Sequence, residues 1–171
     1  VYLNNNPLYN SIFLPVYQYK NASKSSETKG METYVQGIKA PWELYAGYVY
    51  TDAKRNYDID HPRLPLIAQH KFATVIAYEF DEDFRVGIES AFTGQQHLEN
   101  GTETKSYWFA AAMIRYNIGK AAIVLNCENL LDERQNKNGS IVIPPYTNPR
   151  FPEIWKPIDG RVVNLSVYFK W

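Results

Sequence analysis

The end of the chain alternates strictly between two kinds of side chain. Positions 163, 165, 167, 169 and 171 are apolar, and positions 164, 166 and 170 between them are polar. A period of two places successive side chains on opposite faces of a β-strand. The pattern therefore predicts a strand with one apolar and one polar face, and the last side chain, Trp171, lies on the apolar face.

The same kind of pattern predicts eight strands along the chain. They cover residues 8–19, 30–39, 43–51, 70–80, 84–93, 105–116, 121–130 and 161–171. Most are about ten residues long, which is the length a tilted strand needs to cross a bilayer. Strands in soluble proteins average about half that length. The prediction is an all-β, antiparallel meander of about eight transmembrane strands.

The predicted connections alternate in length. Residues 40–42, 81–83 and 117–120 are tight turns made of turn-forming residues, whereas residues 20–29, 52–69, 94–104 and 131–160 form long loops. Outer-membrane barrels have short periplasmic turns and long extracellular loops. We therefore expect both termini on the short-turn side. We expect residues 131–160, which hold five prolines, to form an extended external loop.

Alternation assigns two faces to three of the predicted strands. The strand over residues 105–116 is the least clean of them, because Phe109 and Met113 fall on its polar side, as they would in a strand buried on both faces. The side expected to face lipid carries Phe84, Val86, Ile88 and Phe92; Trp108, Ala110, Ala112, Ile114 and Tyr116; and Ala121, Ile123, Leu125 and Cys127. The other side carries Arg85, Glu89, Arg115 and Glu128, as a wet lumen would allow. We expect Arg85 and Glu89 to form a charge pair, with Arg115 and Glu128 in the same network. These four residues are the candidates for contact with a ligand.

The high aromatic content shows that a low mean hydropathy need not indicate a soluble protein. Mean hydropathy is −0.42, and no apolar run reaches the length of a membrane helix. Yet 15% of the residues are aromatic, and 14 of them are tyrosine, a residue typical of the interfacial girdles of membrane barrels. Alternating strands lower mean hydropathy, so the low value does not exclude a membrane.

Charge and candidate chemistry exclude several classes of protein. Lys+Arg and Asp+Glu are 18 each, so net charge does not favour a nucleic-acid partner. The single Cys127 allows no internal disulfide. The histidines, His61, His70 and His97, are scattered. No nucleophile, base and acid stand at catalytic spacing, and no Gly-rich phosphate loop is present. We therefore expect no enzyme activity, no metal site and no cofactor.

Several segments resemble a known family in their order and spacing. They are "ETKGMETYVQ" (27–36), "LYAGYVYTDAK" (44–54), "RLPLIAQHKF" (63–72), "NCENLLDERQ" (126–135) and "DGRVVNLSVYFKW" (159–171). Together they resemble the C-terminal end of a TonB-dependent outer-membrane receptor. In this family the complete barrel has twenty-two strands and is plugged by an N-terminal domain. Residues 1–171 are then expected to be the C-terminal segment of the barrel, with the plug domain and the TonB box absent.

The resemblance implies active uptake of a scarce ligand across a bacterial outer membrane. A ferric siderophore is the first expectation, and cobalamin, haem or an oligosaccharide are alternatives. The implied partners are outer-membrane lipid, the remainder of the receptor, TonB acting through the plug, and the barrel assembly machinery. That machinery reads a terminal aromatic strand, and Phe169 and Trp171 match its signal.

A rival hypothesis belongs to a different class. Eight strands can close into a small barrel, so the chain could be a self-contained binding or structural protein, either in the membrane or soluble. The uniformly apolar outward faces argue against the soluble version.

Overall fold

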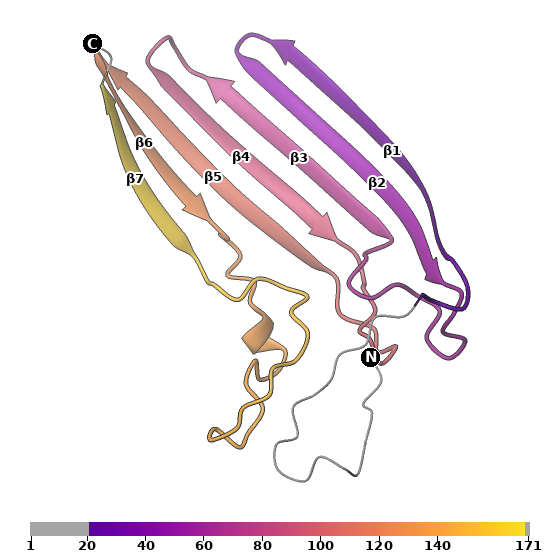
Figure 1. Cartoon of the computed structure of the whole chain (residues 1–171). Coiled ribbons are helices and arrows are strands. Elements are labelled where there is room, and N and C mark those ends of the chain that lie inside the picture. The colour runs from indigo at the N-terminus through magenta and orange to yellow at the C-terminus, as the bar shows by residue number, and fades with distance from the viewer. Residues whose placement is uncertain (1–20, 170–171) are drawn as a thin grey trace.

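The computed structural model describes residues 21–169, which form one antiparallel sheet (Figure 1). Its seven strands are β1 (Ser26–Lys39), β2 (Trp42–Arg55), β3 (His70–Glu79), β4 (Phe84–Thr93), β5 (Tyr107–Ile118), β6 (Ala121–Glu128) and β7 (Val162–Phe169). Each strand pairs with the next in chain order, so the predicted all-β meander is confirmed. A short 3-10 helix, η1 (Gln135–Lys137), lies after β6. Within the described range, no helix is long and apolar enough to cross a membrane.

The observed strands match the predicted ones with one systematic difference. β4 has the predicted bounds, whereas β1 begins four residues earlier than predicted and β2 ends four residues later. The backbone pairing continues as far as Ser26 opposite Arg55. Both faces of this extension carry polar side chains, so hydrophobic alternation did not mark it. The strand predicted over residues 8–19 lies outside the described residues.

Short turns and long loops lie at opposite ends of the sheet (Figure 1). The β5–β6 turn contains only Gly119 and Lys120, and Gly119 has φ +55°, a left-handed conformation that glycine adopts easily. The predicted turn over 117–120 was therefore too long, because Asn117 and Ile118 still pair within the sheet. In the β3–β4 turn, the carboxylate of Asp81 accepts hydrogen bonds from the backbone N–H groups of Asp83 and Phe84.

The strand register places most of the large apolar side chains on one face of the sheet, although Ile38, Val75, Phe109 and Met113 lie on the other. One row of directly opposed residues crosses six strands, namely Trp42, Tyr78, Val86, Ile114, Leu125 and Leu165. The apolar faces predicted for the strands that correspond to β4, β5 and β6 coincide on this side. We call it the apolar face and the other side the polar face.

Two aromatic belts border the apolar face. The belt near the short turns contains Trp42, Tyr78, Phe80, Phe84 and Tyr116, and neighbouring rings have centroids 4.6 to 6.2 Å apart. The belt near the long loops contains Tyr48, Tyr50, His70, Phe72, Phe92 and Trp108. Phe84 and Phe92 stand eight residues apart in β4. That is about 27 Å along the strand at about 3.4 Å per residue, close to the apolar band of about 25 Å in membrane barrels.

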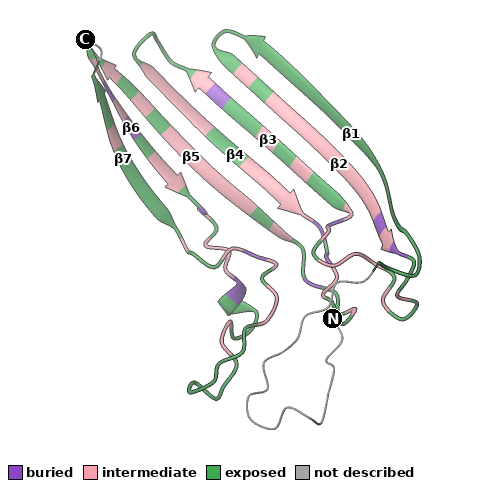
Figure 2. Cartoon of the chain, viewed as in Figure 1, coloured by how far each residue is buried: buried purple, intermediate pink, exposed green. Residues whose placement is uncertain are grey.

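The sheet is a single layer, so its large apolar side chains are not buried by the described chain (Figure 2). The buried hydrophobic residues are all small, namely Ala53, Ala68, Ala77, Ala122 and Val124. Leu44, Ile88, Leu165 and Phe169 remain exposed. Such a face needs an apolar surrounding.

In the described part, β1 and β7 are the outermost strands and do not pair with each other. The seven strands thus form an open sheet, as a section of a larger barrel would. The rival closed barrel needs the strand predicted over residues 8–19, which lies outside the described residues, so it stays a prediction.

Candidate functional site

The polar face carries an ion-pair cluster near the short turns. Arg85 on β4 donates from Nη2 to Glu43 Oε2 on β2 at 2.6 Å and from Nη1 to Glu79 Oε1 on β3 at 2.8 Å. The expected pair of Arg85 with Glu89 was wrong. Four residues along a strand span about 13 Å, whereas directly opposed residues on neighbouring strands lie about 5 Å apart. Cross-strand carboxylates therefore reach Arg85 first.

The predicted network of Arg85, Glu89, Arg115 and Glu128 does not form either. Arg115 is the cross-strand partner of Arg85, but its Nε donates to Asn117 Oδ1 at 3.1 Å. Glu128 lies at the loop end of β6, where Asn164 Nδ2 approaches Oε1 at 3.5 Å. The β5–β6 register pairs Arg115 with Val124, four residues before Glu128, so Arg115 and Glu128 are too far apart to pair.

Glu89 occupies a different position on the polar face. It is exposed, and its cross-strand neighbours are Val75 and Ala111. Among the described residues, it makes no ion pair. The four predicted candidates thus share a face but form no single site. Whether they contact a ligand stays a prediction.

At the opposite end of the sheet, the three long loops (residues 56–69, 94–106 and 129–161) pack into a structure that we call the loop collar. Six polar side chains of the collar and the adjoining strand end are buried, namely Arg55, Gln96, Thr104, Asn129, Gln135 and Lys156. Buried polar groups require hydrogen-bond partners. Arg55 and Gln96 find theirs in other loops, whereas Asn129, Gln135 and Lys156 find theirs in distant parts of the longest loop itself.

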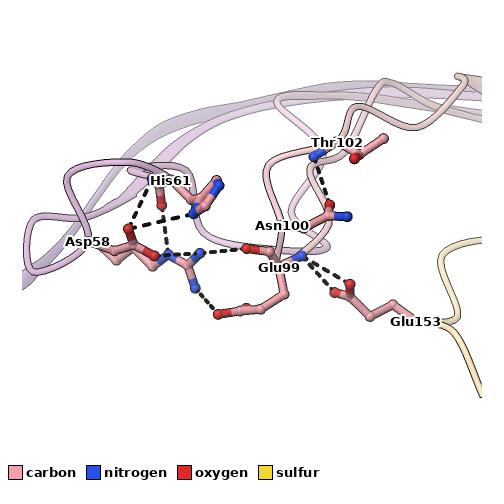
Figure 3. A network of polar contacts seen from close by, with 7 residues as sticks. Asp58, His61, Glu99, Asn100, Thr102 and Glu153 are labelled. Atoms are coloured by element: carbon pink, nitrogen blue, oxygen red, sulfur yellow. Dashed lines mark hydrogen bonds and ion pairs between the residues drawn. The ribbon is translucent and has the colours of Figure 1, made fainter.

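Arg55 joins the first two loops. Figure 3 shows Asp58, His61 and Glu99, the residues that it contacts there. Its side chain is 5% exposed. Its Nε donates to the carbonyl of His61 at 2.8 Å, and one Nη2 contact reaches Asp58 at 3.0 Å. Its guanidinium also pairs with the Glu99 carboxylate and donates to the Glu99 carbonyl at 3.1 Å. The Glu99 backbone N–H then donates to both carboxylate oxygens of Glu153, each at 3.0 Å, so the third loop meets the other two at Glu99.

Gln135 and Gln96 hold the returning part of the longest loop from both sides. Gln135 donates from Nε2 to the carbonyl of Glu153 at 2.8 Å and accepts at Oε1 from the Trp155 N–H at 2.9 Å. Gln96 donates from Nε2 to the Trp155 carbonyl at 3.1 Å. The side chains thus replace the backbone partners that a strand would provide. Residues 153–157 are consequently a fixed part of the collar.

Lys156 anchors the same stretch over the end of β5. Its ammonium forms an ion pair with Glu133 and lies 5.4 Å from the ring centroid of Tyr107 and 5.7 Å from that of Trp155. Cation–π contact and an ion pair together offset the desolvation of a buried lysine.

Asn129 shapes the first turn of the longest loop. Its Nδ2 donates to the carbonyls of Glu133 and Asp159, both at 2.9 Å, and its Oδ1 accepts from the Glu133 N–H at 2.8 Å. Its φ of 49° suits asparagine better than most residues. The side chain therefore joins the start of the loop to its end.

Only the middle of the longest loop projects from the collar. It folds back on itself through the backbone bridge between Ile143 and Arg150, with N–O distances of 2.8 and 3.1 Å. Tyr146 is 79% exposed and Phe151 is 69% exposed, with exposed Arg150 between them in sequence. We call residues 141–151 the projecting hairpin. Exposed rings beside a cation can bind planar or anionic groups.

The histidines lie in three separate surroundings. His61 Nδ1 is 3.8 Å from Asp58 Oδ1, His97 Nε2 is 3.5 Å from Glu103 Oε1, and His70 Nδ1 is 2.7 Å from the Tyr48 hydroxyl. Among the described residues, no three His, Cys, Asp or Glu side chains are grouped to hold a metal ion. Phe169 ends the described chain on the apolar face, and Trp171 lies outside the described residues.

Sequence reasoning missed the collar. Gln96 and Trp155 are 59 positions apart, and no local pattern links them. Asn129 and Gln135, however, lie inside "NCENLLDERQ", so the motif contained two of the residues that build the collar.

Comparisons with known proteins agree with this geometry. The family model for the TonB dependent receptor-like β-barrel matches residues 2–130. Among solved structures, the chain resembles the ferric-catecholate import receptor Fiu from E. coli K12 in its open form, with a TM-score of 0.58 and 22% identity. The match covers 83% of this chain and 20% of that chain, so the present chain spans about a fifth of Fiu. No curated protein matches the chain.

At 22% identity, the likeness to Fiu shows the fold. The family match covers well over half of the chain. The barrels of this family lie in the outer membrane and belong to transport receptors, not to a class of enzymes. The chain belongs to the TonB-dependent receptor β-barrel family.

Proposed function

We propose that the chain forms the C-terminal wall and part of the external loops of an outer-membrane, TonB-dependent receptor that takes up a scarce ligand. The remainder of the barrel, the plug and TonB are supplied by other parts of the system. The apolar face contacts outer-membrane lipid, and the polar face lines the lumen.

The observation that carries this proposal is the polarity of the sheet along its axis. Tight turns close one end, while three loops at the other end join into an ordered collar around buried Arg55, Gln135 and Lys156. Loops of this length in compact proteins are commonly functional. An ordered collar is a rigid base from which the projecting hairpin can present Tyr146, Arg150 and Phe151 to a ligand.

A ferric siderophore is the ligand that we propose first. Exposed aromatic rings and a guanidinium suit an anionic chelate that contains planar groups. Fiu is a ferric-catecholate import receptor, and this supports the same chemical class here. Cobalamin, haem and oligosaccharides are the alternatives that the same experiment compares.

Uptake by cells tests the proposal. The full-length receptor is expressed in a strain that lacks its own siderophore receptors, with or without functional TonB. Accumulation of radioactive iron is measured from a panel of ferric siderophores, with labelled haem and cobalamin in parallel. We expect TonB-dependent accumulation of one ferric siderophore. Accumulation that does not depend on TonB, or none from any ligand at normal surface expression, would overturn the proposal.

A pair of variants then tests the loops. Combined Tyr146→Ala, Arg150→Ala and Phe151→Ala substitutions should weaken ligand binding about tenfold or more, because several exposed contacts are lost together. The matched control is Asn136→Ala with Asn138→Ala, which changes exposed residues of the same loop outside the hairpin. If both variants bind equally well, the hairpin takes no part in capture.

A further inference from the structure

The apolar face is not uniform, because a groove crosses it beside the short turns. The groove has a volume of about 400 Å³ and is lined by Trp42, Ile76, Tyr78, Phe80, Val86 and Ile88, with the backbone of Gly87. These residues come from β2, β3 and β4, except Phe80, which directly follows β3. Its lining is almost entirely apolar side-chain surface.

The shape of the groove follows from the order of side chains in the register. Trp42, Tyr78 and Phe80 form a raised aromatic ridge, in which successive ring centroids lie 4.6 Å apart in edge-to-face geometry. Ile76, Val86 and Ile88 are shorter and form the floor beside the ridge. Trp42 is 49% exposed and Ile88 is 57% exposed, so the described chain leaves this hollow uncovered.

A cationic residue lies on the strand next to the groove. Lys39 is the cross-strand partner of Trp42, and both lie on the apolar face at the short-turn end. This end carries the aromatic belt, and such belts sit at the level of lipid headgroups. A lysine at this depth attracts a lipid phosphate, while the groove offers apolar surface in the direction of the acyl chains.

We propose that this groove is a binding site for one phospholipid of the membrane leaflet at the short-turn end, with an acyl chain in the groove and the phosphate beside Lys39. The inference rests on the proposed membrane placement of the sheet. Retention of this lipid would be tighter than that of the lipids around the rest of the apolar face. The alternative occupants of the groove are a membrane protein and an uncharged apolar molecule, and the test distinguishes both from a phospholipid.

Native mass spectrometry of the full receptor provides the test. The receptor is extracted from membranes, stripped of lipid and titrated with a palmitoyl-oleoyl phosphatidylglycerol and with the diacylglycerol of the same chains. We expect one tightly retained phospholipid and weaker retention of the diacylglycerol, which lacks the phosphate.

Two matched pairs of variants locate the site. Ile88→Trp fills the groove and should lower retention about fivefold or more, whereas Leu125→Trp on the same face outside the groove should leave it unchanged. Lys39→Gln should lower phospholipid retention about fivefold, to the level of the diacylglycerol. Lys29→Gln, on the same face of β1 at its other end, should have no effect.

Equal retention by Ile88→Trp, Leu125→Trp and the unaltered receptor would overturn the proposal, as would a bound protein in place of the lipid. If Ile88→Trp does not assemble, the Lys39→Gln and Lys29→Gln pair decides the question. Ligand uptake by the same variants separates the two proposals. Normal uptake with no selective lipid retention rejects the groove alone, whereas a receptor absent from the membrane rejects the proposed function.

Discussion

At the scale of single residues, buried polar side chains hold the loop collar together. Asn129 is 2% exposed and bonds to both Glu133 and Asp159, so one side chain closes the ends of a loop of some thirty residues. Arg55 does the same between the two shorter loops. Both side chains hold separate loop segments together by hydrogen bonds. Their removal should therefore destabilise the collar and leave the sheet unchanged.

Replacing Asn129 by alanine should destabilise the collar by about 2.5–5.5 kcal/mol. Three hydrogen bonds contribute about 0.5–1.5 kcal/mol each, and a left-handed alanine adds about 1 kcal/mol of strain. Hydrogen exchange of residues 129–137 and 157–161 should accelerate while that of β4 stays unchanged. Asn138→Ala is the control, since the exposed Asn138 makes a single bond of 3.4 Å to the Arg134 carbonyl. Equal exchange in both variants would contradict this role for Asn129.

The turn after β6 should also respond to acid. Lys137, 2.8 Å from the carboxylate, and Arg134, at 3.0 Å, hold the pKa of Asp132 below its ordinary value of 3.8. A carboxyl with a lowered pKa in the folded state stabilises the fold above its unfolded pKa, and this contribution is lost as pH falls through the folded pKa. The contribution should therefore persist at pH 5, begin to fall near pH 3.8 and be lost as pH passes through the lower folded pKa.

Hydrogen exchange of residues 132–137 at pH 5 and at pH 3, corrected for intrinsic rates, measures this effect. The unaltered receptor should lose protection between the two values. Asp132→Asn should already show the lower protection at pH 5 and change little on acidification. A pH step that survives in Asp132→Asn would assign the effect to another group.

At the scale of elements, each strand of the sheet is two-sided, and β7 shows this most clearly. Val163, Leu165, Val167 and Phe169 lie on the apolar face, whereas Asn164, Ser166 and Tyr168 lie on the polar face. Alternation alone indicated these faces. Alternation did not indicate the extended ends of β1 and β2, where ion pairs such as Lys29 with Glu27, at 2.7 Å, occur on a polar stretch of strand.

The two faces of β7 allow a matched test of assembly. We expect Phe169→Ser with Trp171→Ser to reduce the amount of receptor in the outer membrane several-fold, because the terminal aromatic signal is lost. Tyr168→Ser changes an aromatic residue of the same strand on the polar face and should leave assembly unchanged. Heat-modifiable migration on gels and surface labelling measure the folded receptor. Equal assembly of both variants would remove the sorting role of Phe169 and Trp171.

At the scale of the whole molecule, the proposed placement gives the sheet three surroundings: lipid along the apolar face, the lumen along the polar face, and solvent around the collar. Adjacent residues of β5 sample two of them. Ala112 lies on the apolar face opposite Ile88, and Ala111 lies on the polar face opposite Glu89.

Arginine at these two positions should therefore have opposite consequences. Ala112→Arg should destabilise the membrane-inserted receptor by about 2–4 kcal/mol, the range found for a cation near the bilayer midplane. Ala111→Arg places the same charge in the lumen beside Glu89 and should change stability by less than about 1 kcal/mol. Unfolding of the receptor from lipid vesicles by denaturant measures both values. Similar losses in the two variants would contradict the assigned faces.

The sequence by itself determined the all-β class, seven of the strands, the two faces of four of them and the alternation of turns and loops. These features are local, because a period of two and the chemistry of turns are properties of neighbouring residues. Only the tertiary structure decided which charges meet. Arg85 pairs with Glu43, 42 positions away, because the register of three strands brings them together. The loop collar and the groove on the apolar face depend in the same way on contacts between distant segments, which no local pattern specifies.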